Sequence, residues 1–233
     1  MRHSPVTGVV LTNADVDHVA GLLSLREGQP LSLYATARVQ RVLAANPIFD
    51  VLNPAMVIRR TLVLEDQADL LLPDGRPSGL AVLAFPVPGK VALWLEDPAR
   101  ADFGSVEEDS IGLCLTDRAN GRSLWYLPGC ASMPAALAAR LDGAELLLFD
   151  GTTWSDDELQ RTGVGVKTGR RMGHMSMSGP DGSIAALADV AIGRRVFIHI
   201  NNTNPVLLAD SAERAAAVAA GWEVAHDGLE VTL

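Results

Sequence analysis

Residues 8–23 read Gly8-Val9-Val10-Leu11-Thr12-Asn13-Ala14-Asp15-Val16-Asp17-His18-Val19-Ala20-Gly21-Leu22-Leu23. The apolar run at the start is typical of a buried strand, and Val19, Leu22 and Leu23 share one face of a helix that follows it. Asp17 and His18 then lie at the turn between strand and helix, where a rigid strand can hold catalytic groups in place. A carboxylate beside an imidazole can bind one metal ion. The same pair also fits a helix N-cap followed by an exposed histidine.

The length and composition of the chain are sufficient for a folded domain with its own hydrophobic core. The chain has 233 residues, of which 48% are hydrophobic, and we expect a single domain over 1–233. No apolar run approaches the roughly 20 residues of a membrane span, and Met1-Arg2-His3-Ser4-Pro5 carries no apolar signal segment, so we expect a cytoplasmic protein. Two cysteines are too few for a disulfide framework, and the net charge of −9 argues against nucleic acid as a partner.

The order of the apolar runs predicts an α/β protein with a strand-rich middle. Strands are expected at 31–35, 58–64, 79–87, 110–116, 123–127, 144–150, 195–200 and 229–233, and helices at 37–45, 134–141, 183–192 and 211–220. Thr36 is expected to cap the first of these helices, and residues 155–158 predict a further capped start. Asn120-Gly121 is a hairpin signal, and the acidic segment 95–108 is expected to be a surface loop.

Three of the predicted strands end at, or shortly before, residues that can bind a metal: Asp17-His18, Asp150 and His199. If these strands lie near one another in one sheet, their ends share an edge, and ligands of α/β sheets gather outside the carboxyl ends of strands. Two histidines with one or two carboxylates suit Fe(II) and oxygen chemistry, and the same set can hold zinc for hydrolysis. Taken singly, His199 also fits a buried core histidine, and Asp150 also fits a cap of the next turn.

A further candidate is His174, in the polar stretch Gly173-His174-Met175-Ser176. A glycine beside a histidine in a loop suits a ring that must approach a substrate or a metal. The alternative is a loop histidine among packed methionines. The glycine-rich segment before it carries Lys167, Arg170 and Arg171, which could pair with the carboxylates of an acidic substrate. A solvated loop would explain the same three residues.

Four ordered motifs resemble a known family over essentially the whole chain. They are Thr12-Asn13-Ala14-Asp15-Val16-Asp17-His18, Phe149-Asp150-Gly151-Thr152-Thr153-Trp154, Gly173-His174-Met175 and His199-Ile200-Asn201-Asn202-Thr203-Asn204-Pro205. The first resembles the metal signature His-x-His-x-Asp-His of the metallo-β-lactamase superfamily, with Asn13 and Asp15 in place of the first two histidines. Together the four resemble the family of B proteins of pyrroloquinoline quinone (PQQ) biosynthesis.

This resemblance implies an αββα sandwich, in which two mixed β-sheets face each other with helices outside. Members of the family carry an additional N-terminal region, so the chain is expected to be N-terminally short and to lack early strands of the sandwich. The resemblance also implies that one of the two metal sites of the superfamily has been lost. Asp17, His18 and His199 would bind the remaining ion, with Asp150 as a fourth ligand or as a hydrogen-bond acceptor for a ligand.

A two-metal hydrolytic site needs both ions, whereas a single ion leaves positions free for dioxygen and substrate. The family is associated with hydroxylation of the tyrosine ring of a cross-linked Glu-Tyr precursor, so Fe(II) is the expected cofactor and Zn(II) the alternative. His174 would then move protons or orient the substrate, and Asp15 would act as a base or fix a ligand histidine.

The expected partner is a small acidic molecule derived from amino acids, or PQQ itself, and the chain could form a homodimer. Two other functions stay open. One is a carrier that takes PQQ or its precursor to the periplasm without catalysis. The other is a zinc-dependent hydrolase, against which the replacement of two metal-site histidines by Asn13 and Asp15 argues.

Overall fold

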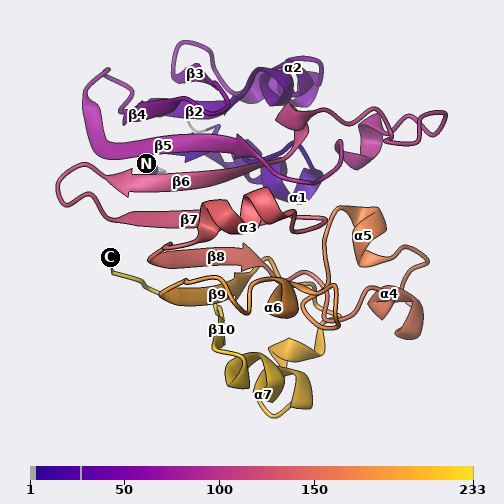
Figure 1. Cartoon of the computed structure of the whole chain (residues 1–233). Coiled ribbons are helices and arrows are strands. Elements are labelled where there is room, and N and C mark those ends of the chain that lie inside the picture. The colour runs from indigo at the N-terminus through magenta and orange to yellow at the C-terminus, as the bar shows by residue number, and fades with distance from the viewer. Residues whose placement is uncertain (1–3, 27, 233) are drawn as a thin grey trace. The chain divides into compact units, whose positions relative to one another are not determined.

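The computed structural model describes residues 4–26 and 28–232 (Figure 1). The chain divides into two compact units. The first unit comprises the chain up to Pro86 together with Lys90–Asn120, and the second comprises Val87–Gly89 together with the chain from Gly121 onward. Within the described residues, no helix combines the length and the apolar character that crossing a membrane requires.

The first unit begins with parallel strands and continues with antiparallel ones. Its strands are β1 (Gly8–Val10), β2 (Leu31–Thr36), β3 (Val57–Leu62), β4 (Gln67–Leu71), β5 (Pro77–Pro86) and β6 (Ile111–Asp117). Its α-helices are α1 (Val16–Val19) and α2 (Ala37–Ala44), and its 3₁₀ helices are η1 (Ala20–Leu25), η2 (Pro47–Val51), η3 (Leu93–Leu95) and η4 (Glu107–Asp109). β1, β2 and β3 pair in parallel in that order, whereas β5 pairs antiparallel with both β4 and β6.

Helix α2 covers the parallel sheet, as the sequence predicts. Thr36 ends β2 and caps α2, because its Oγ1 accepts a hydrogen bond from the Val39 amide at 3.2 Å. The buried face of the helix, formed by Val39, Val42 and Leu43, contacts β2 and β3. This face belongs to the same apolar cluster as Val19 of α1. The opening stretch of the chain is therefore anchored in the core of the first unit.

The second unit is built on parallel strands with helices in the connections. Its strands are β7 (Ser123–Leu127), β8 (Leu146–Asp150), β9 (Arg194–Ile198) and β10 (Trp222–Val224). Its helices are α3 (Ala135–Leu141), α4 (Glu158–Arg161), α5 (Gly169–Met172), α6 (Ser183–Ala186) and α7 (Ala212–Ala219), with the 3₁₀ helix η5 (Pro205–Leu207). β8 lies between β7 and β9, and β10 pairs with the other side of β9; all these pairs are parallel. Parallel neighbours require crossover connections, which these helices supply.

The prediction of a C-terminal strand at 229–233 is wrong for residues 229–232, the part that the structure describes. Residues 229–232 form no strand, and Leu233 lies outside the described residues. The last strand is β10, in a segment where no element was predicted from the sequence. Packing explains the difference, because the Trp222 ring stacks on Phe197 with centroids 3.9 Å apart and planes at 13°. Trp222 is 2% exposed, so β10 exists because a large aromatic side chain is buried there.

Two short helices of the second unit also differ from the prediction. α6 ends at Ala186 instead of continuing to 192, and the chain at Gly193 is hydrogen-bonded to the Ala144 carbonyl instead. α4 begins at Glu158 with Asp157 at its N-cap, where no side-chain cap forms. The Glu158 carboxylate instead accepts a hydrogen bond from the Trp154 amide at 2.6 Å.

Replacing Trp222 by alanine should lower the free energy of unfolding by about 3–5 kcal/mol, because it leaves a cavity against Phe197. Chemical denaturation followed by far-UV circular dichroism measures this change. Val218→Ala on α7 is the control, since Val218 is 59% exposed, and it should shift the unfolding free energy by less than about 0.5 kcal/mol. A loss below about 1 kcal/mol for Trp222→Ala would show that β10 does not depend on this packing.

Candidate metal centre

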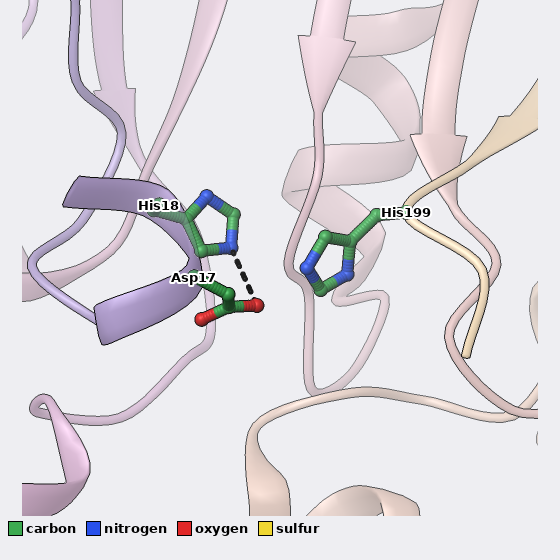
Figure 2. A group of neighbouring side chains, drawn as sticks. All are labelled: Asp17, His18 and His199. Carbon is green, nitrogen blue, oxygen red and sulfur yellow. Dashed lines mark ion pairs between the residues drawn. The ribbon is translucent and has the colours of Figure 1, made fainter. Parts of the chain in front are cut away.

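Asp17 and His18 lie in α1 of the first unit. β1 ends at Val10, residues 11–14 are buried, and α1 follows with Asp15 at its N-cap. His18 Nε2 is 3.8 Å from Asp17 Oδ2 (Figure 2). The His18 side chain is 13% exposed and that of Asp17 is 66% exposed. The alternative of a capping Asp17 followed by an exposed histidine is therefore wrong.

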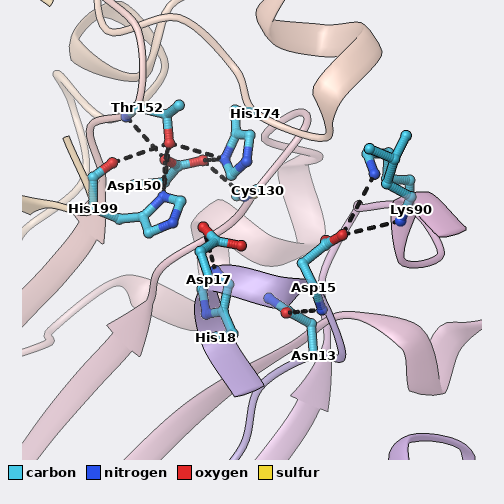
Figure 3. Close-up of polar contacts among 11 residues, drawn as sticks. Asn13, Asp15, Asp17, His18, Lys90, Cys130, Asp150, Thr152, His174 and His199 are labelled. Carbon is cyan, nitrogen blue, oxygen red and sulfur yellow. Dashed lines mark hydrogen bonds and ion pairs between the residues drawn. The ribbon is translucent and has the colours of Figure 1, made fainter. Parts of the chain in front are cut away.

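Asp15 is held by the segment that follows β5. Its Oδ1 accepts a hydrogen bond from the Leu93 amide at 3.0 Å and lies 3.9 Å from Lys90 Nζ (Figure 3). Lys90 Nζ is also 3.4 Å from Glu96. Asn13 Oδ1 accepts a hydrogen bond from the Asp15 amide at 2.9 Å. Within the first unit Asp15 thus contacts a lysine and a backbone amide, and its predicted role as a base or a partner of histidine stays a prediction.

In the second unit, Asp150 and His199 meet at the carboxyl ends of neighbouring parallel strands. Asp150 is the last residue of β8, and it pairs in register with Ile198, the last residue of β9. His199 follows directly. His174 comes from the loop after α5, and the adjacent Met175 amide donates to the Cys130 carbonyl at 2.7 Å. Asp150, His174 and His199 each offer one ligand atom, and these atoms lie within 4.8 Å of one another.

The Asp150 carboxylate is fully buried and accepts hydrogen bonds at both oxygens. Oδ2 accepts from the Cys130 amide at 3.0 Å and lies 2.7 Å from His174 Nδ1, and Oδ1 accepts from the Thr152 amide at 3.1 Å and its hydroxyl at 2.6 Å (Figure 3). Burial by itself raises the pKa of Asp150. The charge of His174 and hydrogen bonds from His174, His199 and Thr152 outweigh burial and hold this pKa well below its usual range. Asp150 is therefore ionised.

Thr152 connects the carboxylate to both histidines, a role that was not predicted from the sequence. Its Oγ1 lies 2.8 Å from His199 Nδ1, 3.1 Å from His174 Nδ1 and 3.0 Å from the His199 carbonyl oxygen. An ionised Asp150 only accepts, so the hydroxyl proton goes to the short bond with Asp150, and His199 Nδ1 donates to Thr152. His174 Nδ1 donates to Asp150. In the neutral form each ring then keeps its lone pair on Nε2, the atom that can bind a cation.

The backbone is shaped to bring these residues together. The two rings stack, with centroids 5.2 Å apart and planes at 25°. His199 has φ +52°, a left-handed conformation that is uncommon outside glycine and often found at functional sites. Gly151 passes close to β9, and a Cβ atom there would lie 3.0 Å from Phe197 Cβ and 3.1 Å from the Ile198 carbonyl oxygen. A glycine between Asp150 and Thr152 therefore permits the close approach of the two strand ends.

Cys130 contributes its backbone to the site and keeps its thiol protonated. Burial, together with the charge of Asp150, raises the pKa of the Cys130 thiol to about 12. A thiol with this pKa is neither a nucleophile nor a ready metal ligand at neutral pH. Cys130 Sγ instead lies 3.0 Å from the Ser132 carbonyl oxygen.

The three basic residues predicted to bind substrate lie in or next to α5. Arg170 is exposed, and its guanidinium is 3.6 Å from Asp181. The Arg171 amide donates to the Thr168 hydroxyl at 3.2 Å, which caps α5, and Lys167 is half-buried. Substrate binding by these residues stays a prediction.

Asp150, His174 and His199, which share the hydrogen-bonded cluster, are residue types that can bind a metal ion. Imidazole nitrogen and carboxylate oxygen are both ligands of iron and zinc, and a carboxylate that holds a histidine through its other ring nitrogen is a usual feature of metal centres. The sequence identified Asp150, His174 and His199 from their places at strand ends and in the glycine-flanked loop. Thr152 could not be distinguished by sequence from a residue that simply forms a turn after Asp150.

A family model described as a beta-lactamase superfamily domain matches residues 1–200. Coenzyme PQQ synthesis protein B of Rhodopseudomonas palustris (strain TIE-1) is 54% identical over 233 residues, which cover 100% of this chain and 76% of that protein. The crystal structure of Zn(2+)-bound PqqB from Methylobacterium extorquens has a TM-score of 0.91 and 52% sequence identity. The match covers 100% of this chain and 75% of that one.

A more distant solved structure shares the fold alone. A diphosphatase from the PhnP family is 20% identical with a TM-score of 0.63, over 96% of this chain and 69% of that one. Together these similarities confirm the predicted α/β metallo-β-lactamase fold. The chain therefore belongs to the family of coenzyme PQQ synthesis protein B, a family of PQQ biosynthesis within the β-lactamase superfamily.

Proposed function

We propose that the chain is an iron-dependent hydroxylase that acts on the tyrosine ring of a Glu-Tyr-derived precursor in PQQ biosynthesis. The observation that carries this proposal is the cluster of Asp150, His174 and His199, whose ligand atoms lie within 4.8 Å of one another. Nitrogen and oxygen ligands of this kind suit Fe(II) in oxygen chemistry. The zinc in the crystal structure of the relative supports a metal site in this family, and Zn(II) is the alternative ion here.

We assign His199 as a residue that binds the ion, through its Nε2. Asp17 and His18 stay predicted ligands, because residues 12–18 resemble the metal signature of the superfamily. Asp150 acts as the buried acceptor that holds the histidine rings, because both its oxygens already accept hydrogen bonds from Cys130, Thr152 and His174. The bound iron would supply the activation of dioxygen. The residues of the chain would set the geometry and move the protons.

The proposed reaction replaces a ring C–H bond by C–OH with one atom of dioxygen. The other atom leaves as water, and a reductant in solution supplies the two electrons and two protons that this requires. His174 has its proton on Nδ1, bound to Asp150, so its Nε2 can accept the proton that the ring releases. The Asp150 carboxylate at 2.7 Å then stabilises the imidazolium.

Removing the His199 ring should abolish metal binding, because the protein loses a ligand whose orientation Thr152 fixes. We expect His199→Ala, purified anaerobically, to retain less than about a tenth of the wild-type Fe(II) and to lose hydroxylation. Metal analysis by inductively coupled plasma mass spectrometry measures the first effect. His226→Gln also removes a histidine and should leave the metal content unchanged. Equal metal content in wild type and His199→Ala would remove His199 from the ligand set.

We expect the Thr152 hydroxyl to affect the affinity for the metal although it does not bind the ion itself. Thr152→Val removes the bonds to Asp150 and to both histidines, so Fe(II) and Zn(II) affinity should fall about 10- to 100-fold. Competition with a chromophoric chelator measures the affinity. Thr152→Ser keeps the hydroxyl and should stay within about threefold of wild type. Equal losses for valine and serine would show that the methyl group, and not the hydroxyl, matters.

Dependence of the reaction on dioxygen distinguishes an iron-dependent hydroxylase from a zinc-dependent hydrolase of the same fold. Protein loaded with Fe(II), given a cross-linked Glu-Tyr substrate, ¹⁸O₂ and ascorbate, should form a product that carries one ¹⁸O atom per hydroxyl added, as mass spectrometry measures. Zinc-loaded protein should be inactive under the same conditions, because zinc has no redox chemistry. Oxygen-independent turnover with zinc would favour a hydrolase. Saturable binding of PQQ without any turnover, unaffected by metal removal, would favour a carrier.

A further inference from the structure

The second unit contains a cavity of about 400 Å³ that is lined by His199 and by residues outside the proposed metal site. Apolar and ionisable side chains share its lining, which includes Ile198, Ile200, Leu207, Arg214, His226 and Asp227. A space of this size fits a small organic molecule, and the ionisable residues of the lining can bind its polar groups.

The pairing of β9 with β10 explains why the cavity lies at this edge. Phe197 and Val224 are paired in parallel register, and the Ala225 amide continues the ladder by donating to the Phe197 carbonyl at 2.9 Å. His199 and His226 each follow two residues after this pair. Both therefore extend from the carboxyl ends of neighbouring parallel strands, where α/β sheets bind their ligands.

Arg214 gives the cavity its anion-binding group. It lies in α7, and its Nη1 donates to the Val206 carbonyl at 3.2 Å, which holds the side chain in place. Over residues 4–26 and 28–232, no carboxylate forms an ion pair with Arg214. Most N–H donors of the guanidinium are thus left for a ligand, and their fork geometry matches a carboxylate. Arg170, by contrast, already faces Asp181 at 3.6 Å.

The two remaining ionisable residues of the lining, His226 and Asp227, determine how a charged ligand would be oriented in the cavity. His226 Nδ1 lies 3.0 Å from the Asp227 carbonyl oxygen, which orients the ring and leaves Nε2 for a ligand. Asp227 belongs to the same lining, and its negative charge would repel an anion placed near it. A ligand with carboxylates would therefore turn them toward Arg214 and away from Asp227.

We propose that this cavity is a carboxylate-binding subsite for the acidic substrate, with Arg214 as its main anchor and His226 as a second polar contact. The inference rests on the proposed function, because it takes the molecule that reacts at His199 to be an acidic small molecule. The apolar side chains that line the cavity would contact the ring of that molecule, and Arg214 would select for its negative charge.

Isothermal titration with PQQ, which carries three carboxylates, tests the subsite directly. Titrations are anaerobic and without reductant, so that no turnover occurs. Arg214→Gln should weaken PQQ binding about 10- to 100-fold, and Arg214→Lys less, because lysine keeps the charge but not the fork. His226→Gln, at an exposed position where folding is not at risk, should weaken binding about threefold. PQQ trimethyl ester should bind wild type at least about tenfold more weakly and should not distinguish it from Arg214→Gln.

Arg194→Gln is the matched control, since it removes the same charge at the opposite end of β9, where Arg194 pairs with Glu223. It should bind PQQ within about twofold of wild type. Equal binding by Arg214→Gln and wild type, equal weakening by Arg194→Gln, or no saturable binding to wild type would overturn the subsite. Arg214-dependent binding without oxygen-dependent hydroxylation would overturn the proposed reaction alone. Hydroxylation with a KM that is unchanged in Arg214→Gln would overturn the subsite alone.

Discussion

A buried carboxylate needs hydrogen-bond donors on every side, and Asp150 obtains them from segments that are far apart in sequence. Leaving a charge in a protein interior without partners is costly, so the donors must be in place whenever Asp150 is ionised. The amide of Cys130 follows β7, the amide and hydroxyl of Thr152 follow β8, and His174 comes from the loop after α5. The stability of the second unit is thereby coupled to the geometry of its functional site.

The same requirement sets the state of the histidines. Because Asp150 can only accept, Thr152 and His174 must donate to it, and His199 must donate to Thr152. Both rings then keep their proton on Nδ1 and their lone pair on Nε2. The protein prepares the rings for a cation through this chain of hydrogen bonds, which is how outer partners tune metal centres in general.

The parallel register of β8, β9 and β10 places the proposed metal ligand His199 and the residues of the neighbouring cavity at one edge of the sheet. Asp150 pairs with Ile198, and His199 and His226 follow equivalent positions of β9 and β10. Arg214 of α7 adds a guanidinium at the same cavity. One sheet edge thus provides residue types that can bind a metal and, next to them, groups that can recognise an anionic small molecule.

The sequence by itself determined what depends on local order: the capped start of α2 at Thr36, the apolar strands, and the metal-binding residue types at the ends of β8 and β9. Periodicity and capping are properties of neighbouring residues, so one chain segment is enough to reveal them. Only the tertiary structure decided that Thr152 connects Asp150 to two histidines, that Trp222 makes β10 a strand by stacking on Phe197, and that Arg214 faces a cavity beside His199. These are contacts between segments distant in the chain, and no local pattern of residues specifies which distant partner a hydroxyl, a ring or a guanidinium will meet.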